Sequence, residues 1–251
     1  MREIQQIGRR TWLAWMAAGT WALWSELTGG FGRPGWRIAL GGADLATCVA
    51  QAQARDPVQA LRVLTDFVNA YVLVRGKEIA IVDTGLPNNG AKFAEIITTA
   101  GLGWEAVGHV LLTHYHPDHV GSMGEVLAAA PQARVYAGAA DIPQITSPRT
   151  ITPVTDGEEV FGLRIIATPG HTPGHISVLD PIGLLLVVGD AMGNVNHRLS
   201  GSNPQYTADM AQATQSVKKL GALTFAKAVF GHGNPLEQDA SAAVATLART
   251  L

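Results

Sequence analysis

The 251-residue chain has little cysteine and little charge. Its single cysteine, Cys48, excludes an internal disulfide bond and any metal site built from cysteine alone. Charged residues make up 15% of the chain, the formal net charge is -2, and like charges do not cluster. The sequence therefore offers no basic groove for nucleic acid and no polybasic patch for a membrane, and we expect a small-molecule partner. An apolar fraction of 47% excludes disorder and predicts a globular protein.

The N-terminal apolar run, Trp12 to Trp24, is also short. It falls below the roughly 20 residues that a bilayer span needs, and this length suits a signal peptide. Arg9 and Arg10 precede it and resemble the paired arginines of a twin-arginine export signal. We therefore predict a signal-like or anchor segment over 1–30, one domain over 31–251, and export to the periplasm or the outer face of the cytoplasmic membrane. Membrane contact would come only through an uncleaved segment; the alternative is a cytoplasmic protein with a packed N-terminal helix.

Beyond this segment, strand-like and helix-like patterns alternate along the chain. Short runs rich in β-branched residues predict strands over 68–74, 79–83, 110–113, 163–167, 176–179, 184–188 and 226–230. Helices are predicted over 91–100, 121–130, 207–220 and 238–251. Residues 192–206 are expected to form a polar loop. Strands interleaved with helices predict a layered α/β domain.

Potential metal ligands cluster directly after the predicted strand 110–113. In an extended chain the side chains at i and i+2 point to the same side, so His114 and His116 can converge on one cation. Pro117 forces a turn, after which Asp118 and His119 can face a second position. Strand ends and the loops after them are where α/β folds hold their sites.

Three later segments can complete the coordination. His171 lies in a Gly/Pro-rich turn, Asp190 follows a glycine at a strand end, and His232 stands between two glycines after another strand. Each residue alone would be an ordinary loop or turn residue. Their combination and their order along the chain are what indicate a metal site.

Together with Asp83-Thr84-Gly85, these residues resemble the metallo-β-lactamase-fold hydrolase superfamily, in its glyoxalase II or lactonase-like branch. The resemblance runs from about Val68 to the C-terminus. It implies a four-layer αββα sandwich and a site for two divalent metal ions. The first ion would be held by His114, His116 and His171, and the second by Asp118, His119 and His232. Asp190 would bridge the two.

Nitrogen and oxygen ligands without thiolate suit Zn(II) and also admit Fe(II) or Mn(II). Two such ions about 3.5–4 Å apart can activate a water molecule as the nucleophile near neutral pH. Asp118 and Asp190 are the candidate catalytic carboxylates, with Asp118 passing a proton to the leaving group. Asp83 is expected to orient a ligand histidine through its other ring nitrogen, a role compatible with that of an ordinary turn residue.

The other histidines receive plainer assignments. His109 is expected to be exposed or at a strand edge, and His175 to form structural hydrogen bonds. His197 and Tyr206 lie in the predicted loop 192–206, which follows Asp190 and could reach over the site. Both are candidate substrate contacts, because loops on a rigid scaffold often determine substrate choice.

The sequence predicts a dinuclear metal-dependent hydrolase that cleaves an ester, lactone or thioester bond of a small molecule. The alternatives left open are a metal-binding accessory or sensor protein without turnover, a β-lactamase and a persulfide dioxygenase. Asp190 argues against a true β-lactamase, since those enzymes usually have cysteine or serine near that point. The substrate and the oligomeric state are not assigned.

Overall fold

The computed structural model of the protein describes residues 56–251. The signal-like segment 1–30, the domain boundary near residue 31, the paired arginines and Cys48 all lie outside the described residues. Within 56–251, no helix has the length and apolar character needed to cross a membrane.

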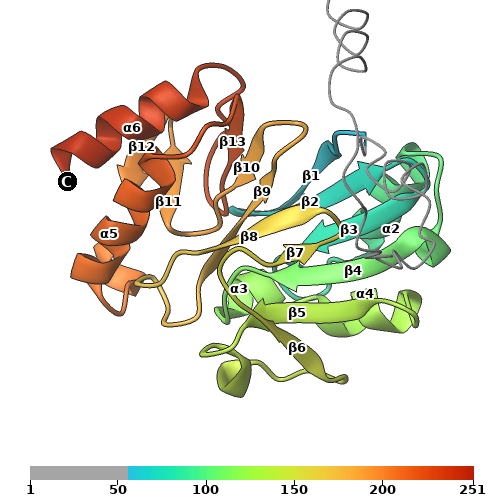
Figure 1. The fold of residues 1–251 in the computed structure, drawn as a ribbon. Helices are drawn as coiled ribbons and strands as arrows, with labels where there is room; N and C mark the ends of the chain where they lie inside the picture. The colour runs from blue at the N-terminus through green and yellow to red at the C-terminus, as the bar shows by residue number, and fades with distance from the viewer. Residues whose placement is uncertain (1–55) are drawn as a thin grey trace, which may run out of the picture. The chain divides into compact units, whose positions relative to one another are not determined.

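The first sheet has six strands in sequence order (Figure 1). These are β1 (Gln59–Thr65), β2 (Val68–Arg75), β3 (Glu78–Val82), β4 (Val107–Leu112), β5 (Arg134–Gly138) and β6 (Ile151–Val154). The first three strands are antiparallel, and β3 to β6 are parallel. Because β3 and β4 run side by side in the same direction, the segments after both strands meet at one edge of the sheet.

The second sheet has five strands in the order β13-β10-β9-β8-β7. They are β7 (Glu159–Val160), β8 (Leu163–Ala167), β9 (Ile176–Asp180), β10 (Leu185–Val187) and β13 (Lys227–Val229). Strands β10 and β13 are parallel and the remaining pairs antiparallel. Residues 190 and 232, which follow these two parallel strands, are thereby brought to one edge of the second sheet.

The helices are α2 (Gly90–Thr99), α3 (Pro117–Val120), α4 (Met123–Ala129), α5 (Met210–Gly221) and α6 (Ala240–Thr250), with short 3-10 turns η1 (Trp104–Ala106), η2 (Ile142–Gln144) and η3 (Pro204–Tyr206). Spacing decides which face each helix buries. Phe93 and Ile97 stand four residues apart on α2 and are both buried, as are Val217 and Leu220 on α5.

Three apolar clusters show that the elements form four layers. One cluster joins α2 and α4 to the first sheet, and a second joins the two sheets. The third joins the second sheet to α5 and α6. The predicted αββα order is therefore observed, with one helical pair outside each sheet (Figure 1).

Most predicted elements are confirmed with small shifts at their ends, including strands β2 and β3. The predicted loop 192–206 is wrong, because it contains a two-stranded hairpin of β11 (Met192–Val195) and β12 (Arg198–Gly201). Its turn residues Asn196 and His197 both have positive φ, at 51° and 59°, as a type I′ turn requires. Asparagine followed by histidine, in place of the usual glycine, conceals this turn in the sequence.

Three other expectations need correction. The predicted helix 121–130 is observed as the shorter α4, whereas helix α3 before it and strands β1, β5, β6 and β7 were not expected. His109 is not at an edge: it lies within β4, between β3 and β5, where it is half-buried. Its ring stacks on Tyr136, with 5.7 Å between ring centroids. Strand β4 therefore begins before the apolar run over 110–113 from which it was predicted.

Candidate metal centre

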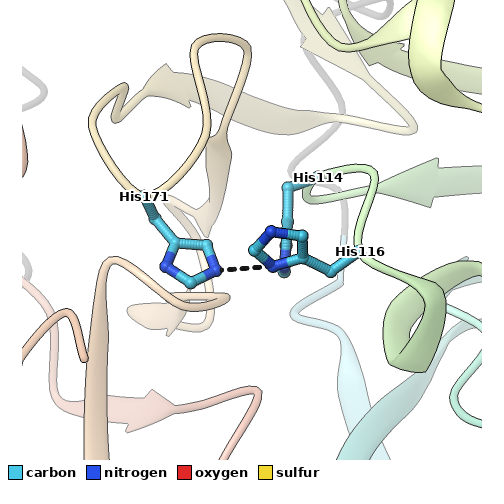
Figure 2. Close-up of side chains that lie close together, drawn as sticks. All are labelled: His114, His116 and His171. Carbon is cyan, nitrogen blue, oxygen red and sulfur yellow. Dashed lines mark hydrogen bonds between the residues drawn. The ribbon is translucent and has the colours of Figure 1, made fainter. Parts of the chain in front are cut away.

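Three histidines from two separate loops meet beyond the end of β4. His116 begins α3, with Pro117 as the first helical residue, and His114 lies two residues before it. Nδ1 of His116 lies 3.0 Å from Nε2 of His114 and 3.0 Å from Nε2 of His171. Figure 2 shows His171 approaching the other two rings from the opposite loop. The convergence predicted for these three side chains is thus observed.

A second group forms beside them. Nε2 of His232 lies 3.4 Å from Oδ2 of Asp118, and Nε2 of His119 lies 3.7 Å from the same oxygen. In each trio, His114-His116-His171 and Asp118-His119-His232, the potential ligand atoms lie within 4.8 Å of one another.

Asp190 lies between the two groups. Its Oδ2 is 3.6 Å from Nε2 of His171 and 3.2 Å from Nε2 of His232, and its Oδ1 is 3.4 Å from Nε2 of His119. One carboxylate therefore contacts members of both trios, which is the geometry expected of a bridging ligand.

The outer ring nitrogens fix the orientation of two histidines through hydroxyl groups. The Thr113 hydroxyl donates to the Asp83 carboxylate, so it accepts from Nδ1 of His114. In the same way, the Thr207 hydroxyl donates to the carbonyl of Asn203 and accepts from Nδ1 of His171. The inward Nε2 atoms of His114 and His171 therefore carry lone pairs.

Two further histidines are held through direct acceptors. Nδ1 of His119 donates to Asp83 over 2.8 Å, and Nδ1 of His232 donates to the carbonyl of Phe67 over 3.1 Å. Histidines that bind metals are oriented in this way, by an acceptor on the ring nitrogen that faces away from the ion. Asp83 therefore makes the predicted contact with the outer ring nitrogen of a candidate ligand histidine. It also accepts a hydrogen bond from the backbone N–H of Thr113.

The charges of the site shift several pKa values. Burial alone would lower the pKa of His119, but Asp190 and Asp83 beside it raise it well above its usual value. For His232, burial is likewise outweighed by hydrogen bonds to Asp118 and Asp190, which raise the pKa to about 10. Burial, together with the neighbouring His116, lowers the pKa of His171 to about 4 despite the opposing charge of Asp190.

The donor set fits divalent metal ions. Among the described residues, Nε2 of His119 and Oδ1 of Asp190 are buried polar atoms without a hydrogen-bond partner. Such orphaned atoms cost free energy unless a ligand satisfies them. Nitrogen atoms aimed inward, together with the carboxylates of Asp118 and Asp190, are ligand types that divalent metal ions take.

Two supporting residues were not identified from the sequence. Gly231 packs so closely beneath the site that a Cβ there would collide with Asp190 and His119. Asp141 is fully buried and accepts from the Thr172 hydroxyl and the backbone N–H of Gly174, which fixes the turn that carries His171. Burial raises the pKa of Asp141. Asp141 lies 30 residues before that turn in the sequence, so no local pattern indicates the contact.

A cavity of about 1300 Å³ opens over the site, and His116, Asp118, His171, Asp190 and His232 form part of its lining. Tyr206 also lines it. His197, the other candidate substrate contact, is exposed in the turn between β11 and β12 and is not among the described residues that line the cavity. Nε2 of His197 lies 3.3 Å from the side-chain nitrogen Nδ2 of Asn234.

Comparison with known proteins agrees with this geometry. The family model described as the metallo-beta-lactamase superfamily matches residues 63–232. The probable metallo-hydrolase YflN of Bacillus subtilis is 28% identical, over 62% of this chain and 75% of YflN. The uncharacterized protein YobT of the same organism is 30% identical, over 49% of this chain and 61% of YobT. The matched region thus spans about three fifths of the length of YobT.

Solved structures share the fold. The metallo-beta-lactamase family protein TTHA1429 from Thermus thermophilus is similar with a TM-score of 0.62 and 25% identity, over 77% of each chain. TTHA1623, solved in a di-iron-bound form, gives a TM-score of 0.60 and 27% identity, over 71% of this chain and 94% of that one. The metallo-beta-lactamase SMB-1 is alike in fold, with a TM-score of 0.60 and 18% identity. The similarity covers 78% of this chain and 91% of the SMB-1 chain.

Proposed function

This chain belongs to the metallo-beta-lactamase superfamily, and we propose that it is a metal-dependent hydrolase that cleaves an ester, lactone or thioester bond of a small molecule. The observation that carries the proposal is the shared orientation of His114, His119, His171 and His232. Each directs Nε2 into the site while Nδ1 is hydrogen-bonded outside it.

The two trios and the central carboxylate support a site for two ions. His114, His116 and His171 would hold the first, Asp118, His119 and His232 the second, and Asp190 would bridge them. Zn(II) suits this ligand set, as do Fe(II) and Mn(II). That TTHA1623 has been solved in a di-iron-bound form makes iron the first alternative to test.

Bound metals would supply Lewis acidity and a water activated near neutral pH. The protein's own residues would do the rest. Asp118 lines the cavity with its side chain about one quarter exposed (23%), so it can reach a substrate and pass a proton to the leaving group. Asp83, Thr113 and Thr207 would keep three ligand rings in fixed orientations, which reduces the reorganisation needed during the reaction.

The test is metal-loaded protein assayed on ester, lactone, thioester and β-lactam panels. We expect turnover of one of the first three classes, abolished by a chelator and restored by added metal. Asp118→Asn should lower kcat while the protein keeps its fold, and exposed Asp239→Asn serves as the control. Bound metal without turnover on any panel would instead indicate an accessory or sensor protein, and turnover of β-lactams alone would place the chain among the β-lactamases.

We further propose export through the N-terminal segment. The support is the pair Arg9 and Arg10 before the apolar run Trp12 to Trp24. Sequencing the N-terminus of protein recovered from its native host tests this. A cytosolic protein that retains Met1 would contradict it.

A further inference from the structure

Exposed apolar side chains gather around the cavity over the metal centre. In the described part of the chain, eight large apolar residues are exposed, and six of them line this cavity. The six are Leu64, Phe67, Val195, Tyr206, Met210 and Leu251. Only Ile182 and Leu184 lie elsewhere. Water-exposed apolar groups concentrated at one opening mark a binding surface, whereas single ones scattered over a protein do not.

The cavity walls come from four separate parts of the fold. The β1–β2 hairpin contributes Leu64, near the end of β1, and Phe67 in its turn, and the β11–β12 hairpin contributes Met192 and Val195. Helix α5 adds Met210, Ala213 and Val217, beside Leu251. The apolar lining therefore continues outward from His232, on whose ring Phe67 stacks with 5.9 Å between centroids.

Charge is scarce on this surface. Apart from the candidate ligands, the charged residues of the lining are Arg62 and Asp66, which have opposite signs. Nε of Arg62 already donates to the side chain of Asn69. A substrate with several anionic groups would find no cluster of cations among the described lining residues. The volume of about 1300 Å³ also exceeds the roughly 300–1,000 Å³ of ordinary small-molecule sites, so the cavity has room for more than the reacting bond.

We infer that the substrate is a neutral acyl compound with a long aliphatic chain, held by this apolar lining while its ester, lactone or thioester group lies at the metal centre. The inference rests on the proposed function for the reacting group, but the chain-binding surface is a separate property of the cavity. Each methylene group that the lining removes fully from water would raise kcat/KM up to about fourfold.

The experiment compares p-nitrophenyl acetate, butyrate and octanoate as substrates of the full-length, metal-loaded protein. The value of kcat/KM should rise at least tenfold from acetate to octanoate. In Met210→Asp and Val195→Asp the octanoate-to-acetate ratio should fall at least fivefold, because a charge then faces the chain. Ile182→Asp is the matched control, since Ile182 is as exposed as Met210 (43% against 39%) but lies outside the cavity, and its ratio should not change.

A second readout does not depend on turnover. Octanamide, a neutral amide, should bind in a calorimetric titration more tightly than acetamide, and Met210→Asp should weaken it. If no ester is hydrolysed but octanamide binds in this way, the proposed reaction fails and the apolar site stands. Turnover that does not increase with chain length, combined with no preference for octanamide, overturns the inference and leaves the hydrolase; a cavity already filled by another part of this chain or by a second copy would give that result.

Discussion

The backbone N–H of Asp190 donates a hydrogen bond to Nε2 of His175, with 2.9 Å between the two nitrogens. The neighbouring hydroxyl groups determine the direction of this bond. Ser177 donates to the carbonyl of Val188, so it accepts from Thr168, which in turn accepts from Nδ1 of His175. His175 is thus neutral, and burial, with His171 nearby, lowers its pKa to about 3. The hydrogen-bonded role expected for it is confirmed, and its acceptor nitrogen holds the segment that carries the proposed bridging carboxylate.

Replacing His175 tests this support. His175→Phe keeps the ring but removes the acceptor, which leaves the N–H of Asp190 unpaired, so we expect metal affinity to fall about 10–100-fold. His175→Gln retains an acceptor and should lose less. Competition with a chelator measures both affinities, and circular dichroism checks that the fold is intact. Equal affinities for the two variants would show that the hydrogen bond does not hold Asp190.

Asp83 should affect metal binding by the trio that contains His119 more than metal binding by the other trio. Asp83→Asn tolerates the positive φ of 60° but removes the charge that accepts from His119. We expect the metal affinity of the trio that contains His119 to fall about 10–100-fold, while the metal affinity of the other trio changes less. Asp239→Asn, also at positive φ (51°) and exposed, is the control. Loss of both metals to the same extent would contradict separate trios.

Metal affinity should depend on pH beyond the range in which ordinary histidines titrate. In the metal-free protein the pKa of His232 is raised to about 10 and that of His119 well above its usual value, so both rings are protonated at pH 7. Metal binding must release these protons, so apparent affinity should rise with pH and continue to rise between pH 7.5 and 9. Chelator competition at several pH values measures this. A plateau above pH 7.5 would show that neither ring is protonated there.

A buried ion pair away from the site should be important for stability. Arg75 and Asp180, with 3.1 Å between Nη2 and Oδ1, are 9% and 1% exposed. Arg75→Met leaves the carboxylate buried without its cation and should cost about 3 kcal/mol of unfolding free energy. Lys227→Met breaks an exposed pair with Glu237 and should cost less than about 1 kcal/mol. Urea denaturation compares the variants, and equal losses would contradict this difference.

The ligand positions were predictable because each follows a strand that the sequence marks with an apolar run. His114, Asp190 and His232 stand after the buried segments of β4, β10 and β13. Parallel pairing of neighbouring strands then brings their ends to the same edge of a sheet. Local pattern and general fold geometry were sufficient to place these side chains at strand ends, whereas their division between two metal ions came from the resemblance to the metallo-β-lactamase superfamily.

The supporting contacts were not predictable, because they join residues distant in sequence. The side chain of Asn69 donates to the carbonyls of Phe230 and Gly233 on either side of His232, 161 and 164 residues away. The β11–β12 hairpin was missed for another reason: its turn lacks the glycine that normally indicates positive φ. Nor does any local pattern indicate which apolar residues gather around the cavity.

The central claim is that two trios and Asp190 hold two divalent ions, and counting the metal ions per chain tests it most directly. Elemental analysis of purified protein, reconstituted in turn with Zn(II), Fe(II) and Mn(II), should give two ions per chain for at least one metal. Asp190→Ala should reduce that number and abolish turnover. One ion or none in the wild-type protein, or two ions and full activity in Asp190→Ala, would contradict the account.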